Sequence, residues 1–193
     1  TVGSVRVDVN MVDRQAAVLT ISNNLSDLST TTGSNGSIVL VSTTAGITIT
    51  DGTDTDAKGV EANGTGNILL NAAAGFIDLQ SGLGSGSGSI SLVANTNISQ
   101  NQASSNIWTT GTGTIDVAVT TGSITMVDGA VTSTTGSGNI RYSAGTTITV
   151  GSLSTSGSVS FKGTAITDSG SAEVDVTGNS LRIDGSERAG EEL

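Results

Sequence analysis

GNILLNAAAGFIDL, residues 66–79, contains the pattern that the rest of the chain repeats. A small polar pair precedes alternating apolar residues at Ile68 and Leu70, an Ala/Gly corner follows, and a second alternation begins at Ile77. Segments 36–50, 88–99, 113–126, 138–150 and 157–167 keep this order of features. Their lead glycines are residues 36, 66, 88, 113, 138 and 157, which gives intervals of 30, 22, 25, 25 and 19 residues. Internal repeats of this size predict a solenoid, a propeller or an array.

Alternation of apolar and polar residues predicts short strands with one face turned inward. The inward residues expected on the first strands are Ile38/Leu40, Ile68/Leu70, Ile90/Leu92, Ile115/Val117, Ile140/Tyr142 and Val159/Phe161. A second strand follows after 9, 9, 8, 9, 8 and 7 residues, led by Ile47, Ile77, Ile98, Ile124, Ile148 and Ile166. A looser third strand is expected at Val60, Leu83, Ile107, Val131, Leu153 and Val174/Val176.

Strands this short cannot pair as long hairpins, but they can pair if equivalent strands stack in successive coils. We therefore expect an all-β fold, a right-handed parallel β-helix with three faces and about seven coils. Coils about 4.8 Å apart would give a rod on the order of 35 Å long. The alternative is an antiparallel β-sandwich, because short, regularly spaced strands also fit that fold. The β-helix is favoured because a sandwich does not require the same strand–corner–strand sequence pattern to occur six times.

The repeats divide the chain into three parts. We expect an irregular first coil or cap over 1–35, β-helix repeats over 36–178, and a last strand with a flexible tail over 179–193. The chain begins in the middle of its pattern, at TVGSVRVDV, which suggests an excerpt of a longer protein.

Composition excludes several classes of function. The formal net charge is −10, with seven Lys and Arg residues, so binding to nucleic acid, which depends on neutralising phosphates, is not expected. The chain has no Cys and no His, which removes disulfides and the usual nucleophile–base pairs. No run of 18 apolar residues is present, so no membrane-spanning segment is expected.

The densest group of carboxylates is the loop that contains Asp51, Asp54 and Asp56, with Glu61 nearby. Acidic loops supply the oxygen ligands that hard cations prefer, so this loop is the candidate calcium site. The spacing matches only part of an EF-hand loop, because Lys58 stands where a ligand is wanted. The alternative is a solvated corner insertion, and no other cofactor is expected.

The candidates for paired catalytic carboxylates are Asp78, Asp116, Asp128, Asp168 and Asp175. They are expected on different coils and faces, without neighbouring basic residues. Arg141 and Lys162 begin adjacent first strands and are expected to lie side by side on the outside. These scattered carboxylates and two basic residues do not form a recognisable catalytic arrangement, so we expect that the protein is not an enzyme.

Two features suggest a binding surface. The outward positions of the second strands read Thr48, Asp78, Ser99, Thr125, Thr149 and Thr167, a row rich in hydroxyl groups. Such a row could bind a glycan or ice, although Thr is also simply a good strand residue. Trp108 should point outward beside an inward Ile107, where its ring could stack on a sugar or contact a protein. The alternative for Trp108 is packing beneath a neighbouring corner loop.

Three of the repeated segments read GSISLVANTNIS, GNILLNAAAGFIDL and GSIVLVSTTAGITIT. They resemble repeats of filamentous-haemagglutinin-like exoproteins and related large bacterial adhesins. The resemblance covers about residues 36–178. It implies a non-catalytic structural shaft of an extracellular or cell-surface bacterial protein with a role in adhesion. It also implies a partner on a host or neighbouring cell, a surface protein or glycan. The alternatives are a carbohydrate-binding β-solenoid, which would use the Thr row or Trp108, and a polysaccharide-active enzyme.

Overall fold

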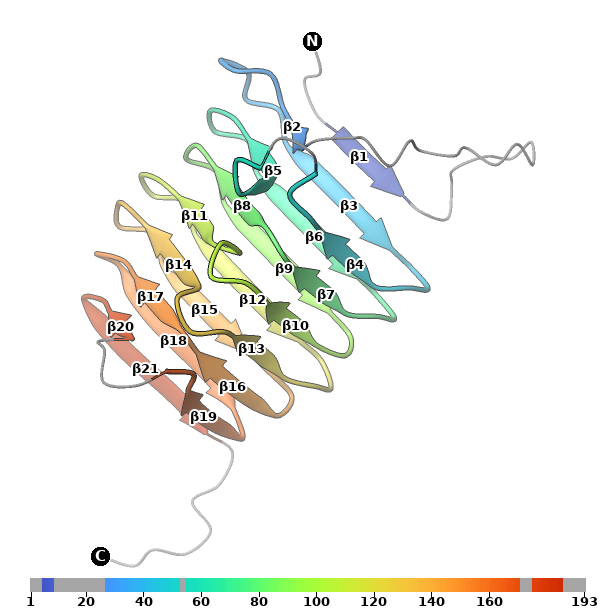
Figure 1. Ribbon diagram of the computed structural model, residues 1–193. Helices are drawn as coiled ribbons and strands as arrows, with labels where there is room; N and C mark the ends of the chain where they lie inside the picture. Colours follow the sequence, from blue (N-terminus) through green and yellow to red (C-terminus); the bar gives the residue numbers. More distant parts are fainter. Residues whose placement is uncertain (1–4, 9–26, 53–54, 171–174, 186–193) are drawn as a thin grey trace, which may run out of the picture.

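Three parallel β-sheets wind around one core in the computed structural model, which describes residues 5–8, 27–52, 55–170 and 175–185. Successive coils stack along the rod, and the first and last described strands lie at opposite ends of the stack (Figure 1). Every pair of neighbouring strands is parallel, from β1 with β3 to β18 with β21. The predicted β-helix is therefore confirmed, and the antiparallel sandwich is wrong.

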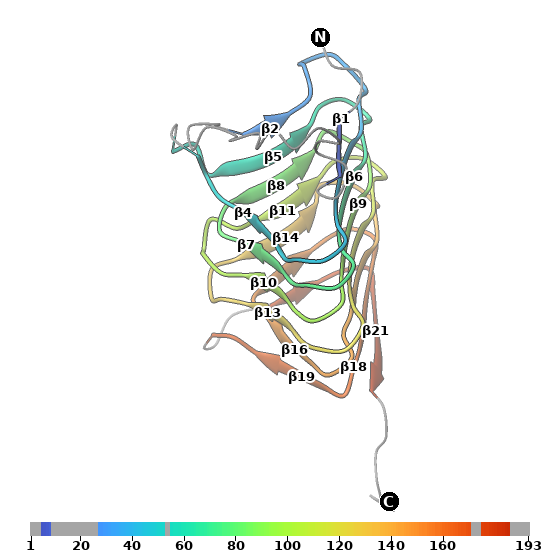
Figure 2. The same cartoon turned by 90° about the vertical axis from the view of Figure 1, so that its right-hand side faces the viewer.

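The first sheet has eight strands and contains the first strand of each repeat. In sheet order they are β1 (Val5–Asp8), β3 (Ile38–Ser42), β6 (Ile68–Ala72), β9 (Ile90–Ala94), β12 (Ile115–Val119), β15 (Ile140–Ser143), β18 (Ser158–Gly163) and β21 (Ser180–Gly185). Figure 2 shows this sheet along one side of the rod, with the other two sheets facing it.

The second sheet has six strands and the third has seven. The second contains β4 (Ile47–Ile49), β7 (Ile77–Leu79), β10 (Ile98–Gln100), β13 (Ile124–Met126), β16 (Thr147–Val150) and β19 (Ala165–Asp168). The third contains β2 (Leu28–Ser29), β5 (Lys58–Ala62), β8 (Gly82–Ser85), β11 (Ile107–Thr109), β14 (Val131–Thr134), β17 (Ser152–Ser154) and β20 (Val176–Thr177). About five full turns separate β3 from β18, slightly fewer than the seven coils predicted.

Identical inward positions stack on one another along the rod. Ile38 pairs with Ile68, Ile68 with Ile90, and the ladder continues through Ile115 and Ile140. These side chains are at most 1% exposed, so each contacts its equivalent above and below instead of water. Burial of one such side chain contributes roughly 2 kcal/mol. The predicted first-strand register is confirmed.

The third sheet departs from the prediction in β14. Thr132, not Val131, pairs with Ile107 and Leu153 in the inward ladder. Thr132 is fully buried and Val131 is only half-buried. The predicted register was wrong by one residue because Val and Thr are both β-branched and fit a strand equally well. Leu40 and Ile166 are partly buried residues at the margin of the core, while Val174 lies outside the described residues.

The lead glycines stack on one another at the corner before the first sheet. A Cβ atom at Gly88 would overlap the carbonyl oxygen of Gly66, and one at Gly138 would overlap that of Gly113. The backbones of successive coils touch here, because nothing separates them except the ladder spacing of about 4.8 Å. Glycine is therefore required at this position by close approach and not by a left-handed backbone angle, since the lead glycines are not among the residues with positive φ.

Hydroxyl groups fill the inner side of the same corner. Ser85 Oγ donates to Gly66 O at 2.7 Å, and Thr109 Oγ1 donates to Gly88 O at 2.7 Å. These residues occupy the last inward position of the third sheet, where their hydroxyls bond to the carbonyl groups of the glycine corner. Thr155 Oγ1 repeats the contact with Gly138 O at 2.5 Å. Each of these three buried hydroxyl groups thus has a partner, as buried polar groups generally need.

One buried hydrogen-bond network joins all three sheets. Tyr142 on the first sheet donates its hydroxyl to Gln100 Oε1 on the second at 2.8 Å. Thr132 on the third sheet lies 2.6 Å from the Tyr142 hydroxyl, and Gln100 Nε2 donates to Ser105 O at 2.8 Å. Burial raises the pKa of the Tyr142 phenol well above its ordinary value of 10, so this phenol stays neutral wherever the rod is folded.

Substitution of a lead glycine tests the corner packing. Gly138→Ala is expected to lower the free energy of unfolding by about 2 kcal/mol, because the new methyl group forces apart the backbones of two coils. The measurement is urea-induced unfolding followed by circular dichroism. Ser137→Ala, an exposed change at the preceding residue, is the matched control. Equal midpoints for the two variants would contradict the glycine ladder.

Titration of Tyr142 tests the buried network, because the chain contains one tyrosine. The unfolded chain should form tyrosinate near pH ~10, whereas the folded chain should not. Since the pKa of the phenol is raised in the folded state, its contribution to the free energy of unfolding is fully present below pH ~10. This contribution is lost as the pH rises further. Near-ultraviolet absorbance with and without urea measures the difference. Tyr142→Phe should abolish the alkaline loss of stability, and coincident titration curves would refute the burial.

Candidate functional site

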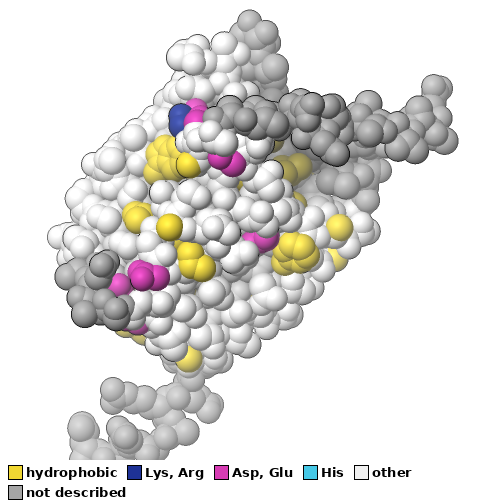
Figure 3. Space-filling model, viewed as in Figure 1, with side chains coloured by type: hydrophobic (Ala, Val, Ile, Leu, Met, Phe, Trp, Pro, Cys, Tyr) yellow, Lys and Arg dark blue, Asp and Glu magenta, His cyan; other side chains and the backbone are white. Residues whose placement is uncertain are grey.

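The outward side chains of the rod are mostly small and polar. Figure 3 shows a face on which hydrophobic side chains form separate small patches and acidic side chains gather in a few places. The predicted binding and catalytic residues that the structure describes belong to this outer surface or to its loops.

Trp108 lies on the outside of the third sheet, as predicted, but it is half-buried. Its indole covers the backbone of β8 in the preceding coil, because a Cβ atom at Gly84 would overlap the indole ring and one at Gly82 would lie 2.7 Å from it. The alternative explanation, packing against a neighbouring coil, therefore accounts for one side of the ring. The signal for this contact is the Gly-Leu-Gly sequence at 82–84, which leaves both outward positions of β8 without side chains.

The predicted row of outward residues on the second sheet is in register. Thr48, Asp78, Ser99, Thr125, Thr149 and Thr167 pair in that order from β4 to β19. Neighbours within the row bond to each other: Ser99 Oγ donates to Asp78 Oδ1 at 2.7 Å, and the hydroxyls of Thr149 and Thr167 are 3.2 Å apart. The row offers one side chain per coil, because these strands are only three or four residues long.

The acidic loop keeps its carboxylates apart. Asp51 Oδ1 accepts a hydrogen bond from Ser81 Oγ at 3.3 Å, and Asp56 Oδ1 accepts one from the Lys58 backbone N–H at 2.9 Å. Lys58 Nζ forms an ion pair with Glu61 at 3.2 Å. Asp54 lies outside the described residues, and within the described ranges no three acidic residues are grouped to hold a metal ion. Calcium binding by this loop stays a prediction.

The expectation that the acidic residues lack basic neighbours is wrong for Asp116. Arg141 stands opposite Asp116 on the next strand of the first sheet and donates to both carboxylate oxygens, at 2.7 Å from Nε and 2.6 Å from Nη2. This forked pair raises the pKa of Arg141 further. Arg141 is also not beside Lys162, because its partner on β18 is Ser160.

Three of the remaining candidates converge at the corner between the second and third sheets. Asp128, Asp168 and Asp175 come from three different segments and lie close enough for their charges to interact. Partial burial and the charges of Asp168 and Asp128 raise the pKa of Asp175 above its ordinary value. The spacing of the sequence could not reveal this cluster, because Asp128 is far along the chain from Asp168 and Asp175 and belongs to a different coil.

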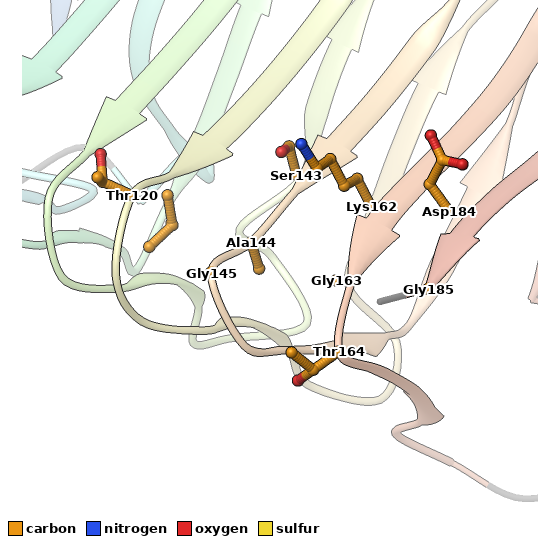
Figure 4. A pocket seen from close by; sticks show the side chains of 10 residues that line it. Thr120, Ser143, Ala144, Gly145, Lys162, Gly163, Thr164, Asp184 and Gly185 are labelled. Atoms are coloured by element: carbon orange, nitrogen blue, oxygen red, sulfur yellow. The ribbon is translucent and has the colours of Figure 1, made fainter. Parts of the chain in front are cut away.

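A groove with a volume of about 430 Å³ lies where the first-sheet strands β12 to β21 end. Ser143, Lys162 and Asp184 stand side by side on neighbouring strands along one of its walls. Figure 4 shows the Lys162 side chain extended towards Ser143, with the Asp184 carboxylate on the other side. Sequence reasoning placed no site here, and we call this feature the Lys162 groove.

The Lys162 groove arises because the last three corners after the first sheet become successively shorter. Residues 120–123 connect β12 to β13, residues 144–146 connect β15 to β16, and Thr164 alone connects β18 to β19. The intervals of 9, 8 and 7 residues between the leading positions of these strands are the sequence signal for this shortening. Each shorter corner recedes behind the one before it, which leaves a hollow beside Thr120.

Comparisons with known protein families, with curated proteins and with solved structures found no match to this chain. Within the described residues, no helix is long and apolar enough to cross a membrane.

Asp175→Asn tests the acidic cluster. Because the pKa of Asp175 is raised in the folded chain, ionisation of this group costs stability as the pH rises through that pKa. The variant should therefore have a slightly higher Tm than the parent at pH 7 and low salt. The advantage should vanish at high salt, which screens the repulsion, and at a pH below about 3.9, where Asp is protonated in both states. Thermal unfolding measures the effect.

Asp56→Asn is the control for this prediction, because its side-chain oxygen can still accept the hydrogen bond from Lys58 N–H. An equal rise in Tm for both variants would assign the effect to net charge and contradict a local cluster.

Proposed function

We propose that this chain is a non-catalytic repeat segment that acts as the shaft of an extracellular or cell-surface bacterial protein. The observation that carries the proposal is the unbroken register of the first sheet, in which equivalent residues pair from β3 through β18. A solenoid of this kind buries its core coil by coil, so it can be lengthened without a larger core. The resemblance of its repeats to those of filamentous-haemagglutinin-like adhesins supports the same role.

The distribution of charges also supports a structural role. On the described surface, Arg141, Lys58 and Arg182 each form an ion pair with a carboxylate of their own chain. Such exposed pairs contribute little stability individually, about 0–1 kcal/mol, but they leave few of the described cationic groups free for chemistry. The net charge of −10 disfavours nucleic acid as a partner. A protein or glycan on another cell surface is the partner class that fits an adhesive shaft.

Insertion of extra coils tests the shaft. Two additional copies of residues 66–87, placed after Ser87, should extend the rod by about 10 Å, because each coil adds about 4.8 Å. Every copy begins with a lead glycine, so the glycine ladder is preserved. Small-angle X-ray scattering measures the maximum dimension, and circular dichroism checks that the β content rises.

A shuffled insert with the same composition is the control, and it should leave the length of the rod unchanged. Failure of the repeat insert to lengthen the rod would mean that the coils are not interchangeable, which contradicts a shaft. The location is read separately, by protease treatment of intact source cells. Complete protection of this segment in intact cells would refute the surface assignment.

A further inference from the structure

Within the described ranges, the Lys162 groove contains one cation without an ion-pair partner. Asp184 is opposite Lys162 on the neighbouring strand, but the Asp184 carboxylate pairs with Arg182 at 2.7 Å. Lys162 is exposed, and its side-chain ammonium group has no hydrogen-bond or ion-pair partner among the described residues, whereas that of Lys58 has Glu61. The ammonium group of Lys162 is therefore available to a ligand.

Ser143 lies near the end of the Lys162 side chain (Figure 4), and further hydrogen-bonding residues line other parts of the groove. The hydroxyls of Thr120, Ser143 and Thr164 and the carboxylate of Asp184 line the groove. Beneath them, Ala144 and Val119, which are 8% and 6% exposed, form a small apolar floor. A ligand that fits this lining has one negative charge, several hydroxyl groups and short apolar C–H faces.

The hollow itself is a permanent feature of the backbone. A Cβ atom at Gly163 would lie 2.7 Å from Thr146 O, and one at Gly145 would lie 2.6 Å from Thr120 O. The close approach of successive corners therefore keeps these positions small, so no side chain from them can fill the groove. The volume of about 430 Å³ is within the range of pockets that hold small ligands.

Charge balance selects the kind of anion. The lining contributes one ammonium and one carboxylate, and the chain as a whole carries −10. A dianionic phosphate or a polyanion would face the Asp184 carboxylate and the overall negative field with a single lysine to offset them. One carboxylate on an otherwise neutral, hydroxyl-rich molecule avoids both repulsions, and Asp184 can then accept hydrogen bonds from its hydroxyl groups.

We propose that the Lys162 groove binds a carboxylate-bearing sugar residue, with Lys162 Nζ holding the carboxylate. This inference rests on the proposed function only in identifying a surface glycan as the source of the sugar. Binding is expected to be weak, because one charge-assisted hydrogen bond carries most of the selectivity.

The test is an NMR titration of the isotope-labelled full chain with methyl glucuronide, and with the neutral methyl glucoside as a second probe. Glucuronide should shift the backbone signals of the groove residues in a saturable way, and glucoside should bind at least about tenfold more weakly. Lys162→Met should weaken glucuronide binding at least about tenfold. Lys58→Met, which removes the same charge from the third sheet, should leave it unchanged.

Three results would overturn the proposal. Equal binding of glucuronide and glucoside would remove the role of the carboxylate, and unchanged binding by Lys162→Met would remove the role of the lysine. Equal affinity for acetate or inorganic phosphate would reduce the groove to a general anion site. None of these results affects rod length in scattering experiments, so failure here is distinguishable from failure of the shaft.

Discussion

The parallel hydrogen-bond ladder between coils is the constraint on which the rest of this structure depends. It holds each backbone about 4.8 Å from the next, so any residue is in contact with its equivalent one coil away. Inward isoleucines benefit from this repetition, because they pack against an identical shape. At the corners the same spacing leaves no room for a Cβ atom between successive backbones. Only glycine therefore fits at positions such as Gly88 and Gly138. A single distance thus explains both the apolar ladders and the glycine content.

The same spacing allows polar groups inside a thin core. A corner of stacked glycines presents a column of carbonyl oxygens to the interior, and the hydroxyls of Ser85, Thr109 and Thr155 bond to it. An aliphatic side chain there would leave buried carbonyls without partners, at a cost of about 1–3 kcal/mol each. The network of Gln100, Thr132 and Tyr142 applies the same rule between sheets. The core is therefore stabilised by buried hydrogen bonds as well as by apolar packing, although it contains few aromatic residues.

Local alternation was sufficient to predict the first sheet, because a lead glycine and two aliphatic residues at period two define its register at every coil. The third sheet was harder: Val131 and Thr132 are adjacent and both suit a strand, and the choice depends on the hydroxyl partners of Thr132 in the core. Gln100 was missed for a related reason, since a polar residue at an inward position is visible only once Tyr142, from two coils away, is known to meet it. The Lys162 groove depends on differences in length between corners, which no single repeat contains.

In a stack of coils, the apolar side chains of one coil are shielded from water by the neighbouring coils. Val159 and Phe161 in β18 are 1% and 3% exposed, whereas Leu181 and Ile183, their partners in β21, are 54% and 57% exposed. The residue types and register are equivalent, so the difference comes from the absence of a described strand beyond β21. In a solenoid, stability is the sum of coil and interface terms between nearest neighbours. Each first-sheet strand from β3 to β18 has a described neighbour on both sides and so contributes two interfaces, and Gln100, Thr132 and Tyr142 join the three sheets within this part of the rod.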